Sequence, residues 1–266
     1  METFFNIPIH PGEYDPIRLC IVMPMTETEI VKVKENMASM LKLNPCTEQC
    51  QTIDLIFYFN RDMNSSIVKF FKDVQSLTKG YYRNFGLLFA NLSHEQDTYP
   101  LGASLMFFDL LKSGKLSDKY DKFFLMEADV IPCRENWLDQ VYKQSIGEFW
   151  MKGSILRYPS ASQGTSNFAE HINGNAIYSL SPNFQKFLQM VESKFLKHSK
   201  RYLDSYDIAI YTILHDRYAV SYEQFTDWVH LFVYSDFIVN VYRRKILLDM
   251  ICRQNPSTFL VHGRYV

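Results

Sequence analysis

The sequence predicts an α/β fold, with a Rossmann-like, mostly parallel central sheet flanked by helices in a single domain. Short apolar runs rich in β-branched and aromatic residues recur through the first half of the chain. Each is followed by a segment whose apolar residues repeat with helical spacing. Strands that alternate with helices of this length form right-handed βαβ units, which build parallel sheets. The chain has 266 residues, of which 47% are hydrophobic, so it can bury a large core.

The first half of the chain supplies most of this sheet. The predicted strands are 17–23, 53–59, 84–92 and 122–130. The predicted helices between them are 26–43, 65–77 and 100–111. We expect Pro24 to end the first strand, Asn44 and Pro45 to end the first helix, and Ser65 or Ser66 to cap the second.

The second half is less regular and is expected to form a smaller part of the same domain. Its predicted elements are a strand at 150–156, a polar stretch at 157–170, a turn and strand at 171–180, helices at 182–196 and 204–215, and a helix within 236–252. The tail from Asn255 onward is not helical. No repeat or linker separates the halves, so we divide one domain, 1–266, into 17–132 and 133–266.

Composition excludes several classes of partner. With 28 basic and 29 acidic residues the formal net charge is −1, whereas nucleic-acid and anionic-membrane binding usually leave a basic excess. No run reaches the roughly 18–20 apolar residues that span a bilayer, and the N-terminus does not resemble a signal peptide. We expect a soluble, cytoplasmic protein, in the host cytoplasm if it is viral; the Golgi lumen would fit only if an anchor had been removed. The 5 cysteines form no disulfide framework or zinc pattern, so reduced thiols are expected.

Two acidic residues, Glu127 and Asp129, follow the fourth predicted strand. Residues two apart on an extended segment point the same way, so both can face one site if extended geometry continues through Asp129. Parallel sheets bind ligands at the carboxyl ends of their strands. Two carboxylates there can hold Mg²⁺ or Mn²⁺. The alternative is two solvated carboxylates at the start of a loop.

Three segments, LCIVMPMT, IDLIFYFNRD and KFFLMEADVIPCRENWL, resemble the nucleotide-sugar half of glycosyltransferases with the GT-A fold. Glu127-Ala128-Asp129 is similar to the E-x-D form of the acidic motif that binds a divalent metal on a nucleoside diphosphate sugar in those enzymes. The similarity extends in order from about residue 17 to 264. Together with WMKGS and HINGNAIY, it most resembles the soluble transferases of large algal viruses (chlorovirus type), and a xylosyltransferase among them.

The resemblance implies which residues hold the donor. The ends of the first two strands would contact the nucleoside, and a tyrosine and a glycine at the start of the third helix would lie beside them. These residues are Met23, Pro24, Met25, Asn60, Arg61, Tyr99 and Gly102, together with Ala128 in the acidic motif. Asn60 and Arg61 can donate hydrogen bonds to uracil, ribose or phosphate, or they form a polar turn that closes a strand. Gly102 allows close approach of a sugar or phosphate, or serves helix packing.

The resemblance also implies an acceptor segment in the second half. Its residues are Trp150, Lys152, Gly153, Asn173, Gly174 and Asn175. Trp150 would stack on a sugar ring, and a buried core tryptophan is the alternative. Asn173-Gly174-Asn175 is also compatible with an ordinary Asn-Gly turn.

A base and a third metal ligand complete the predicted site. In an inverting transfer, a carboxylate takes the acceptor proton, and Asp207 or Asp204 at the start of a helix would serve, although both also suit a helix N-terminus. By resemblance, His262 would return to the metal, while Arg264 contacts the diphosphate; a frayed chain end is the alternative.

These features predict a metal-dependent glycosyltransferase. It would move a sugar from a nucleoside diphosphate sugar, with a UDP-sugar such as UDP-xylose favoured, to an oligosaccharide or glycoprotein hydroxyl. An inverting outcome is expected, although the sequence does not settle it. One alternative is a sugar-nucleotide pyrophosphorylase, which normally has a glycine-rich basic loop where this chain has residues 24–29. The other is a non-catalytic carbohydrate- or nucleotide-binding module of the same fold.

Overall fold

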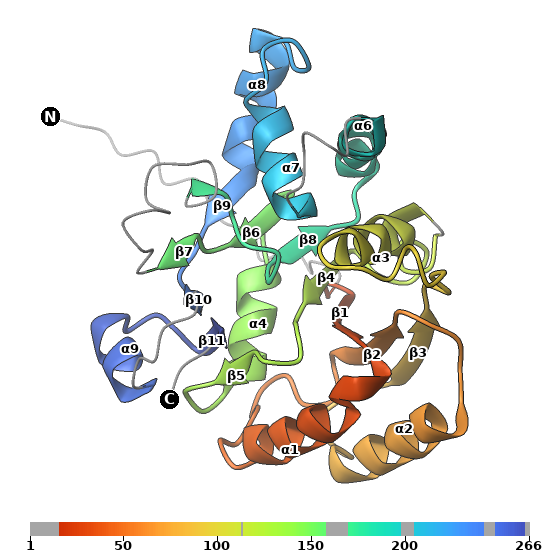
Figure 1. The fold of residues 1–266 in the computed structure, drawn as a ribbon. Coiled ribbons are helices and arrows are strands. Elements are labelled where there is room, and N and C mark those ends of the chain that lie inside the picture. Colours follow the sequence, from red (N-terminus) through yellow and green to blue (C-terminus); the bar gives the residue numbers. More distant parts are fainter. Residues whose placement is uncertain (1–15, 113, 158–169, 198–204, 242–247, 264–266) are drawn as a thin grey trace, which may run out of the picture.

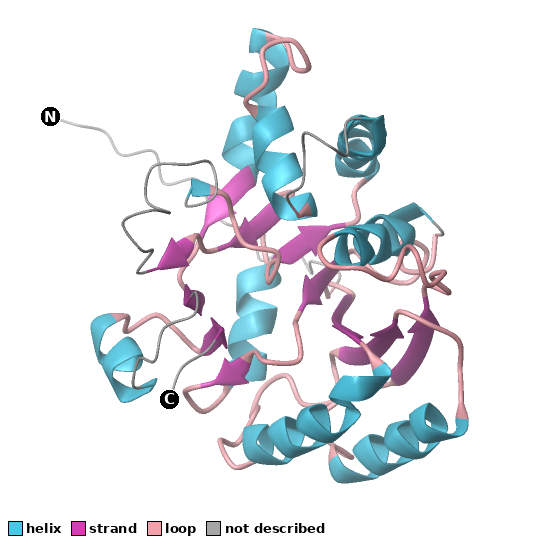
Figure 2. Ribbon diagram, viewed as in Figure 1, coloured by secondary structure: helices cyan, strands magenta, loops and turns pink. Residues whose placement is uncertain are grey.

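A seven-stranded, mostly parallel sheet forms the centre of the molecule in the computed structural model, which describes residues 16–112, 114–157, 170–197, 205–241 and 248–263 (Figures 1 and 2). Its strands, in spatial order, are β3 (Phe85–Phe89), β2 (Asp54–Phe59), β1 (Leu19–Met25), β4 (Lys122–Leu125), β8 (Ile177–Ser179), β6 (Met151–Gly153) and β9 (Phe232–Tyr234). Neighbouring strands are parallel except where β8 pairs with β4 and β6. The predicted α/β class is confirmed.

Helices cover both faces of this sheet, because alternate residues of the central strands bury their side chains on opposite sides. One face packs against α1 (Ile30–Leu41, after a 3₁₀ turn at Glu27–Glu29), α2 (Ser65–Leu77) and α4 (Trp137–Ser145). The other packs against α3 (Leu101–Lys112), α6 (Pro182–Lys197) and α7 (Tyr206–Leu214). The short helix α8 (Tyr222–Trp228) follows α7 at the top of Figure 1.

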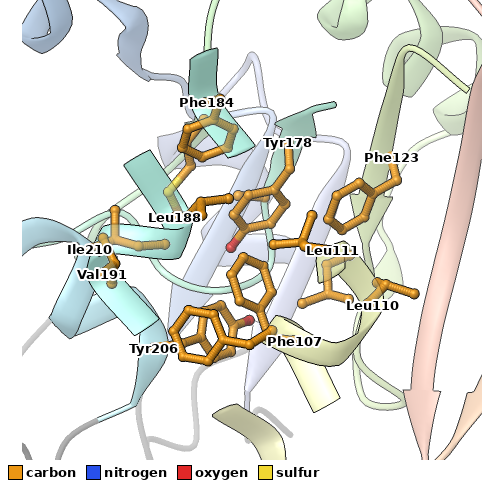
Figure 3. Close-up of a cluster of buried hydrophobic side chains, with 14 of the residues drawn as sticks. Phe107, Leu110, Leu111, Phe123, Tyr178, Phe184, Leu188, Val191, Tyr206 and Ile210 are labelled. Carbon is orange, nitrogen blue, oxygen red and sulfur yellow. The ribbon is translucent and has the colours of Figure 1, made fainter. Parts of the chain in front are cut away.

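Aromatic rings fill the core between the sheet and α3, α6 and α7 (Figure 3). Phe107 of α3 stacks on Tyr206 of α7 with ring centroids 4.0 Å apart, and Phe123 of β4 stacks on Tyr178 of β8 at 5.1 Å. Stacked rings of this kind add to the free energy gained by burial alone. They fix the start of α7 against α3, beside the carboxyl ends of the strands.

A second, four-stranded sheet brings the C-terminal segment to the acidic motif. Its strands, in spatial order, are β5 (Ile131–Pro132), β11 (Leu260–Gly263), β10 (Ile238–Val241) and β7 (Leu156–Arg157). β11 pairs antiparallel with β5, with Val261 opposite Ile131. This register carries His262 past Ile131 toward Asp129. The helix α9 (Leu248–Gln254) lies beside β10 and β11 in Figure 1.

Several predicted boundaries are wrong. β1 continues through Pro24 to Met25, and the N-cap of α2 is Asn64, whose side chain accepts a hydrogen bond from the Ile67 amide at 3.0 Å. The fourth strand ends at Leu125, before the acidic pair. The segment 236–252 contains β10 as well as a helix, and α8, β9 and β10 were not predicted.

The cysteines differ from one another in their bonding state. The prediction of reduced thiols is wrong for Cys46 and Cys50, which form a disulfide, and holds for Cys20, Cys133 and Cys252. Among the described residues, no helix combines the length and apolar character needed to cross a lipid bilayer.

Candidate metal centre and adjoining cavity

Glu127, Asp129 and His262 converge at the carboxyl edge of the central sheet. The His262 Nε2 atom lies 2.8 Å from Glu127 Oε2 and 3.3 Å from Asp129 Oδ1. One ligand atom from each of the three residues lies within 4.8 Å of the other two. The sequence placed these residues in one site, and the structure brings them together.

The two acids face one site for a different reason from the one predicted. Extended geometry does not continue through Asp129; the chain turns at Ala128, where the Val130 amide donates to the Glu127 carbonyl at 3.0 Å. Asn36 of α1 holds this turn by donating from its side chain to the Ala128 carbonyl at 2.7 Å. The turn therefore aims both carboxylates at His262.

This group of ligands fits a divalent metal ion. Two carboxylates and one imidazole suit Mn²⁺, while Mg²⁺ prefers oxygen ligands alone. Burial lowers the pKa of His262, but the adjacent carboxylates of Glu127 and Asp129 raise it further, to about 10. Burial raises the pKa of Asp129, but the hydrogen bond from His262, together with the charges of His262 and Lys32, outweighs burial and lowers it. Without a metal ion, the positive charge of the protonated His262 imidazole therefore balances part of the negative charge of the two carboxylates.

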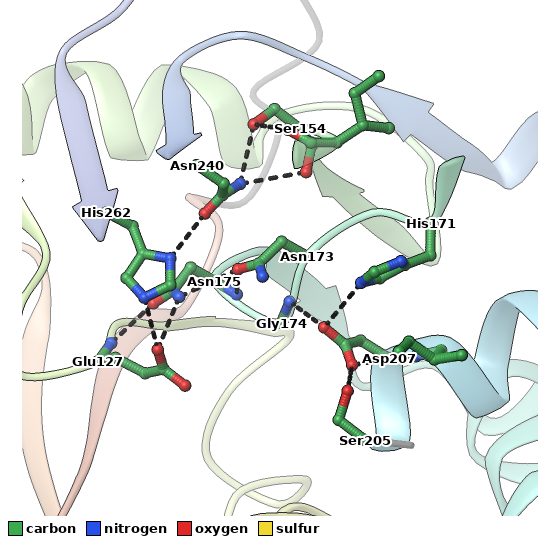
Figure 4. Close-up of polar contacts among 12 residues, drawn as sticks. Glu127, Ser154, His171, Asn173, Gly174, Asn175, Ser205, Asp207, Asn240 and His262 are labelled. Atoms are coloured by element: carbon green, nitrogen blue, oxygen red, sulfur yellow. Dashed lines mark hydrogen bonds and ion pairs between the residues drawn. The ribbon is translucent and has the colours of Figure 1, made fainter. Parts of the chain in front are cut away.

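Asn175 holds Glu127 in place (Figure 4). Its side-chain oxygen accepts a hydrogen bond from the Glu127 amide at 2.8 Å, and its nitrogen donates to Glu127 Oε2 at 3.1 Å. Asn173 in turn accepts from the Asn175 amide and side chain, both at 3.1 Å. The predicted acceptor segment thus contacts the metal centre.

Asp207 lies behind this segment and is buried. Its Oδ2 atom accepts a hydrogen bond from the Gly174 amide at 2.8 Å and lies 3.4 Å from His171 Nε2 (Figure 4). Its Oδ1 atom accepts from the Ser205 hydroxyl and from the Ile208 amide at 3.0 Å. Burial raises the pKa of Asp207, but the contact with His171, together with the hydrogen bonds from Ser205 and Gly174, outweighs burial and lowers it. The other predicted base, Asp204, lies outside the described residues, as does Arg264.

A cavity of about 500 Å³ opens beside the metal centre, between the carboxyl ends of β1, β2 and β4 and helix α3. Predicted residues on its wall are Pro24, Met25, Asn60, Tyr99, Gly102, Glu127, Ala128 and Asp129. The stacked Phe107 and Tyr206 also line it. Predicted donor residues from four separate segments therefore line one space.

The polar side chains of Asn60 and Asp97 also line the cavity. Asn60 donates to Asp97 Oδ2 at 2.8 Å, and Arg61 Nε donates to the same oxygen at 2.8 Å. The hydrogen bond from Asn60 is the main reason that the pKa of Asp97 is lowered. Arg61 is not on the cavity wall but contacts Asp97, which is.

Other predicted site residues lie elsewhere. Met23 is buried in the core under α1 and α2. Trp150 packs among Phe184, Trp228 and other rings of the core, which favours the alternative weighed for it. Gly153 is a packing position, because a Cβ atom there would lie 2.9 Å from both Ala176 Cβ and Ile172 Cγ2.

Lys152 is half-buried in β6, with its ammonium group 5.5 Å from the centroid of the Phe149 ring. It does not line the cavity.

Gly174 cannot carry a side chain without movement of its neighbours, since a Cβ atom would lie 2.3 Å from the Tyr206 hydroxyl.

Sequence reasoning missed several residues of this region, among them Lys32, Asp97, Tyr206 and Asn240. Lys32 projects from α1 onto the cavity wall and helps to lower the pKa of Asp129. Asn240 is a polar residue within the apolar run FIVNV, a signal that could have been used. Asp97 lies in a polar loop with no pattern to distinguish it.

Comparison with known proteins gives matches among solved structures alone. No protein-family model matches the sequence, and no curated protein matches it. The galactosyltransferase LgtC, solved with donor and acceptor sugar analogues, aligns with a TM-score of 0.55 and 15% identity over 92% of this chain and 86% of LgtC. Mouse xyloside xylosyltransferase 1 aligns with a TM-score of 0.50 and 12% identity, over 94% of this chain and 98% of the mouse protein.

The chain has the GT-A fold. A third match, the bifunctional glycosyltransferase WbbM, aligns with a TM-score of 0.51 and 11% identity over 94% of this chain and 46% of WbbM. At such identities the likeness extends to the fold. The predicted GT-A-like architecture is therefore confirmed, while the viral and xylosyl subtypes stay predictions.

Proposed function

We propose that this protein is a metal-dependent glycosyltransferase that uses a nucleoside diphosphate sugar, with a UDP-sugar favoured, and a glycan hydroxyl as acceptor. One observation carries the proposal: Glu127, Asp129 and His262 meet at the wall of a cavity of about 500 Å³. A site of this size suits a small ligand or cofactor. The printed names of the matched structures, a galactosyltransferase and a xylosyltransferase among them, agree with sugar transfer.

Each part of the donor has complementary groups in the cavity. Asn60, Asp97 and Thr98 offer donors and acceptors for a nucleoside, and Tyr99 offers an exposed ring. Lys32 supplies a positive charge on the same wall as Asp129. Glu127, Asp129 and His262 would hold Mn²⁺, which, when bound, neutralises the diphosphate as it leaves. The sugar would then lie over Tyr206 and Phe107.

The contacts of Asp207 favour a positioning role over that of a base. A general base works best with a pKa near the working pH and must reach the proton that it takes. Asp207 is 5% exposed, has a lowered pKa, accepts internal hydrogen bonds at both oxygens and does not line the cavity. We infer that it holds Gly174 and, through the backbone, Asn175 beside Glu127. The predicted inverting outcome depends on a base, so it stays a prediction.

Among the described residues on the cavity wall, the carboxylates are Glu29, Asp97, Glu127 and Asp129. Glu29 bonds to Thr26 at 2.8 Å, Asp97 is held by Asn60, and the other two belong to the metal centre. None of them is free to act as a base. Transfer with retention of configuration, which needs no such base, is compatible with the described part of the wall. The anomeric configuration of the product, measured by proton NMR, decides between the two outcomes.

A thermal-unfolding screen tests the function. UDP- and GDP-sugars are added with and without Mn²⁺, and UDP-xylose, UDP-galactose and UDP-glucose separate pentose from hexose donors. A ligand at 100 times its Kd stabilises a protein by about 2.7 kcal/mol, which corresponds to a shift of about 5–10 °C. We expect a UDP-sugar to give a shift of this size with Mn²⁺ and a smaller one with EDTA.

The variant Asp129→Asn should lose the Mn²⁺-dependent part of this shift, because an amide is a poorer ligand for a divalent cation. Asp73→Asn is the matched control: Asp73 pairs with Lys34 between α1 and α2, on the surface and away from the cavity. The proposal fails if no nucleotide stabilises the wild type in a metal-dependent way. Stabilisation without release of UDP in the presence of glycan acceptors would support the binding-module alternative.

A further inference from the structure

We propose that Asn240 is a positioning residue for the metal centre: its side-chain amide sets which ring nitrogen of His262 faces Glu127 and Asp129. The inference rests on the proposed function, because it concerns the metal ligand. Asn240 and His262 are paired neighbours on the parallel strands β10 and β11. Residues paired in this way have side chains on the same face of a sheet. Asn240 Oδ1 lies 3.0 Å from His262 Nδ1 (Figure 4).

The orientation of the Asn240 amide follows from its other contacts. Its Nδ2 atom lies 3.1 Å from the Ser154 carbonyl oxygen and 2.9 Å from Ser154 Oγ. A carbonyl oxygen can only accept hydrogen bonds, so the nitrogen must be the atom that faces it. The amide oxygen is therefore the atom that faces His262.

This orientation determines the state of the imidazole. An amide oxygen can only accept, so the ring nitrogen beside it, Nδ1, must carry a proton. Nε2, the atom 2.8 Å from Glu127 Oε2, is then the ring nitrogen that gives up its proton and offers a lone pair when a cation binds. A hydrogen bond at one ring nitrogen commonly selects the other as the metal ligand.

Burial makes this contact a strong constraint. Asn240 is 1% exposed, and every polar atom of its side chain has a protein partner in the described structure. Ser154, which anchors the amide, is 2% exposed and lies between β6 and β7. Asn175 orients the Glu127 carboxylate in the same way that Asn240 orients the His262 ring. Two buried carboxamides thus orient two of the three candidate ligands.

A double-mutant cycle on Mn²⁺ affinity tests the inference. Free Mn²⁺ is counted by electron paramagnetic resonance during titration of four proteins without nucleotide: wild type, Asn240→Leu, His262→Ala and the double variant. Leu is close to Asn in size but cannot accept a hydrogen bond. Loss of a partner of this kind weakens metal binding by about 10–100-fold, and we expect this for Asn240→Leu in the wild-type background. In the His262→Ala background we expect less than about a two-fold change, because the ligand that Asn240 orients is gone.

Several outcomes would overturn the proposal. Asn240→Leu overturns it if Mn²⁺ affinity is unchanged, or if the loss is as large with His262→Ala as without it, which would indicate a merely structural effect. Urea unfolding of the same four proteins separates the positioning role from a structural one. Any loss of stability caused by Asn240→Leu should persist in the His262→Ala background, whereas its effect on Mn²⁺ affinity should not. If the wild type binds no Mn²⁺, the proposed function fails as well. If it binds Mn²⁺ and the cycle shows no coupling, only this inference fails.

A second measurement needs no metal. In protein labelled with ¹⁵N-histidine, the hydrogen bond to Asn240 should protect the Nδ1 proton of His262 from exchange and make its signal visible. The variant His262→Ala assigns the signal, and Asn240→Leu should abolish it. The proposal is contradicted if the protected signal survives in Asn240→Leu. Ser154→Ala, which removes one of the two contacts of the Asn240 nitrogen, should retain it.

Discussion

At the scale of single residues, Gly263 shows how tightly the backbones of β10 and β11 pack beside the metal centre. Its φ angle is +107°, which residues with a side chain rarely adopt, and a Cβ atom would lie 1.8 Å from the Val241 carbonyl oxygen. The absence of a side chain lets the backbone of β11 approach Val241 of β10 this closely. The neighbouring His262 can therefore reach Asn240 and the acidic turn at the same time.

We predict that Gly263→Ala destabilises the protein by about 3–5 kcal/mol, because it adds a clash with backbone to the strain at positive φ. Gly80→Ala is the matched control, since Gly80 has a φ of +95° and no atom within 4 Å of a built Cβ. It should cost about 1–2 kcal/mol, the strain alone. Urea unfolding measures both, and equal losses would contradict the clash with Val241.

The two roles considered for Asp207 differ in what they do to metal affinity. We predict that Asp207→Asn weakens Mn²⁺ binding several-fold, because Gly174 and Asn175 lose part of their support, and lowers kcat modestly. A base would behave differently: its loss typically costs about 10²–10⁴-fold in rate and leaves metal binding unchanged. Mn²⁺ titration and UDP release distinguish the two, and the second pattern would restore Asp207 as the base.

At the scale of elements, the sequence predicted the first half well for a physical reason. Strands buried on both faces are continuous apolar runs, so β1, β2 and β4 could be recognised from composition alone. The end of β4 could not, because the turn at Ala128 contains no glycine or proline and depends on Asn36 of another helix. β9 and β10 are short strands whose pairing partners lie far away in the sequence. Local patterns carry little information about such strands.

Asp54, at the start of β2, bonds to residues just before β3 and just before β4. It accepts hydrogen bonds from Arg83 Nε and the Tyr120 hydroxyl, each at 2.8 Å, and from the Asn84 amide at 3.2 Å. Burial raises the pKa of Asp54, but the contact with Arg83, together with the other hydrogen bonds, outweighs burial and lowers it. The charged form is therefore more stable in the folded protein than in the unfolded chain.

We predict that Asp54→Asn costs about 2–3 kcal/mol at pH 7, because a buried charged partner is lost. The stabilisation is complete above the unfolded pKa of about 3.9 and is lost as pH falls through the lower pKa of the folded state. The difference between wild type and variant should accordingly shrink below about pH 4. Urea unfolding between pH 7 and pH 3 measures it, and a difference that grew with acidity would refute this account.

At the scale of the whole molecule, the candidate metal centre combines distant parts of the chain. The resemblance to GT-A enzymes predicted Glu127, Asp129 and His262 together, and the pairing of β11 with β5 is the physical reason that they meet. Nothing in the local sequence reveals that pairing. Asp97 and Asn240 were missed for the same reason, since each acquires its role from a partner in another element.

The pairing of β11 with β5 also bears on the order of folding. Glu127 and His262 are separated by about half the chain, and closing so long a loop costs conformational entropy that early local contacts need not overcome. The parallel strands β1 to β4 can associate before that loop closes. Cation binding during refolding would then report the last step of assembly, so a bound ion marks a molecule that has finished folding.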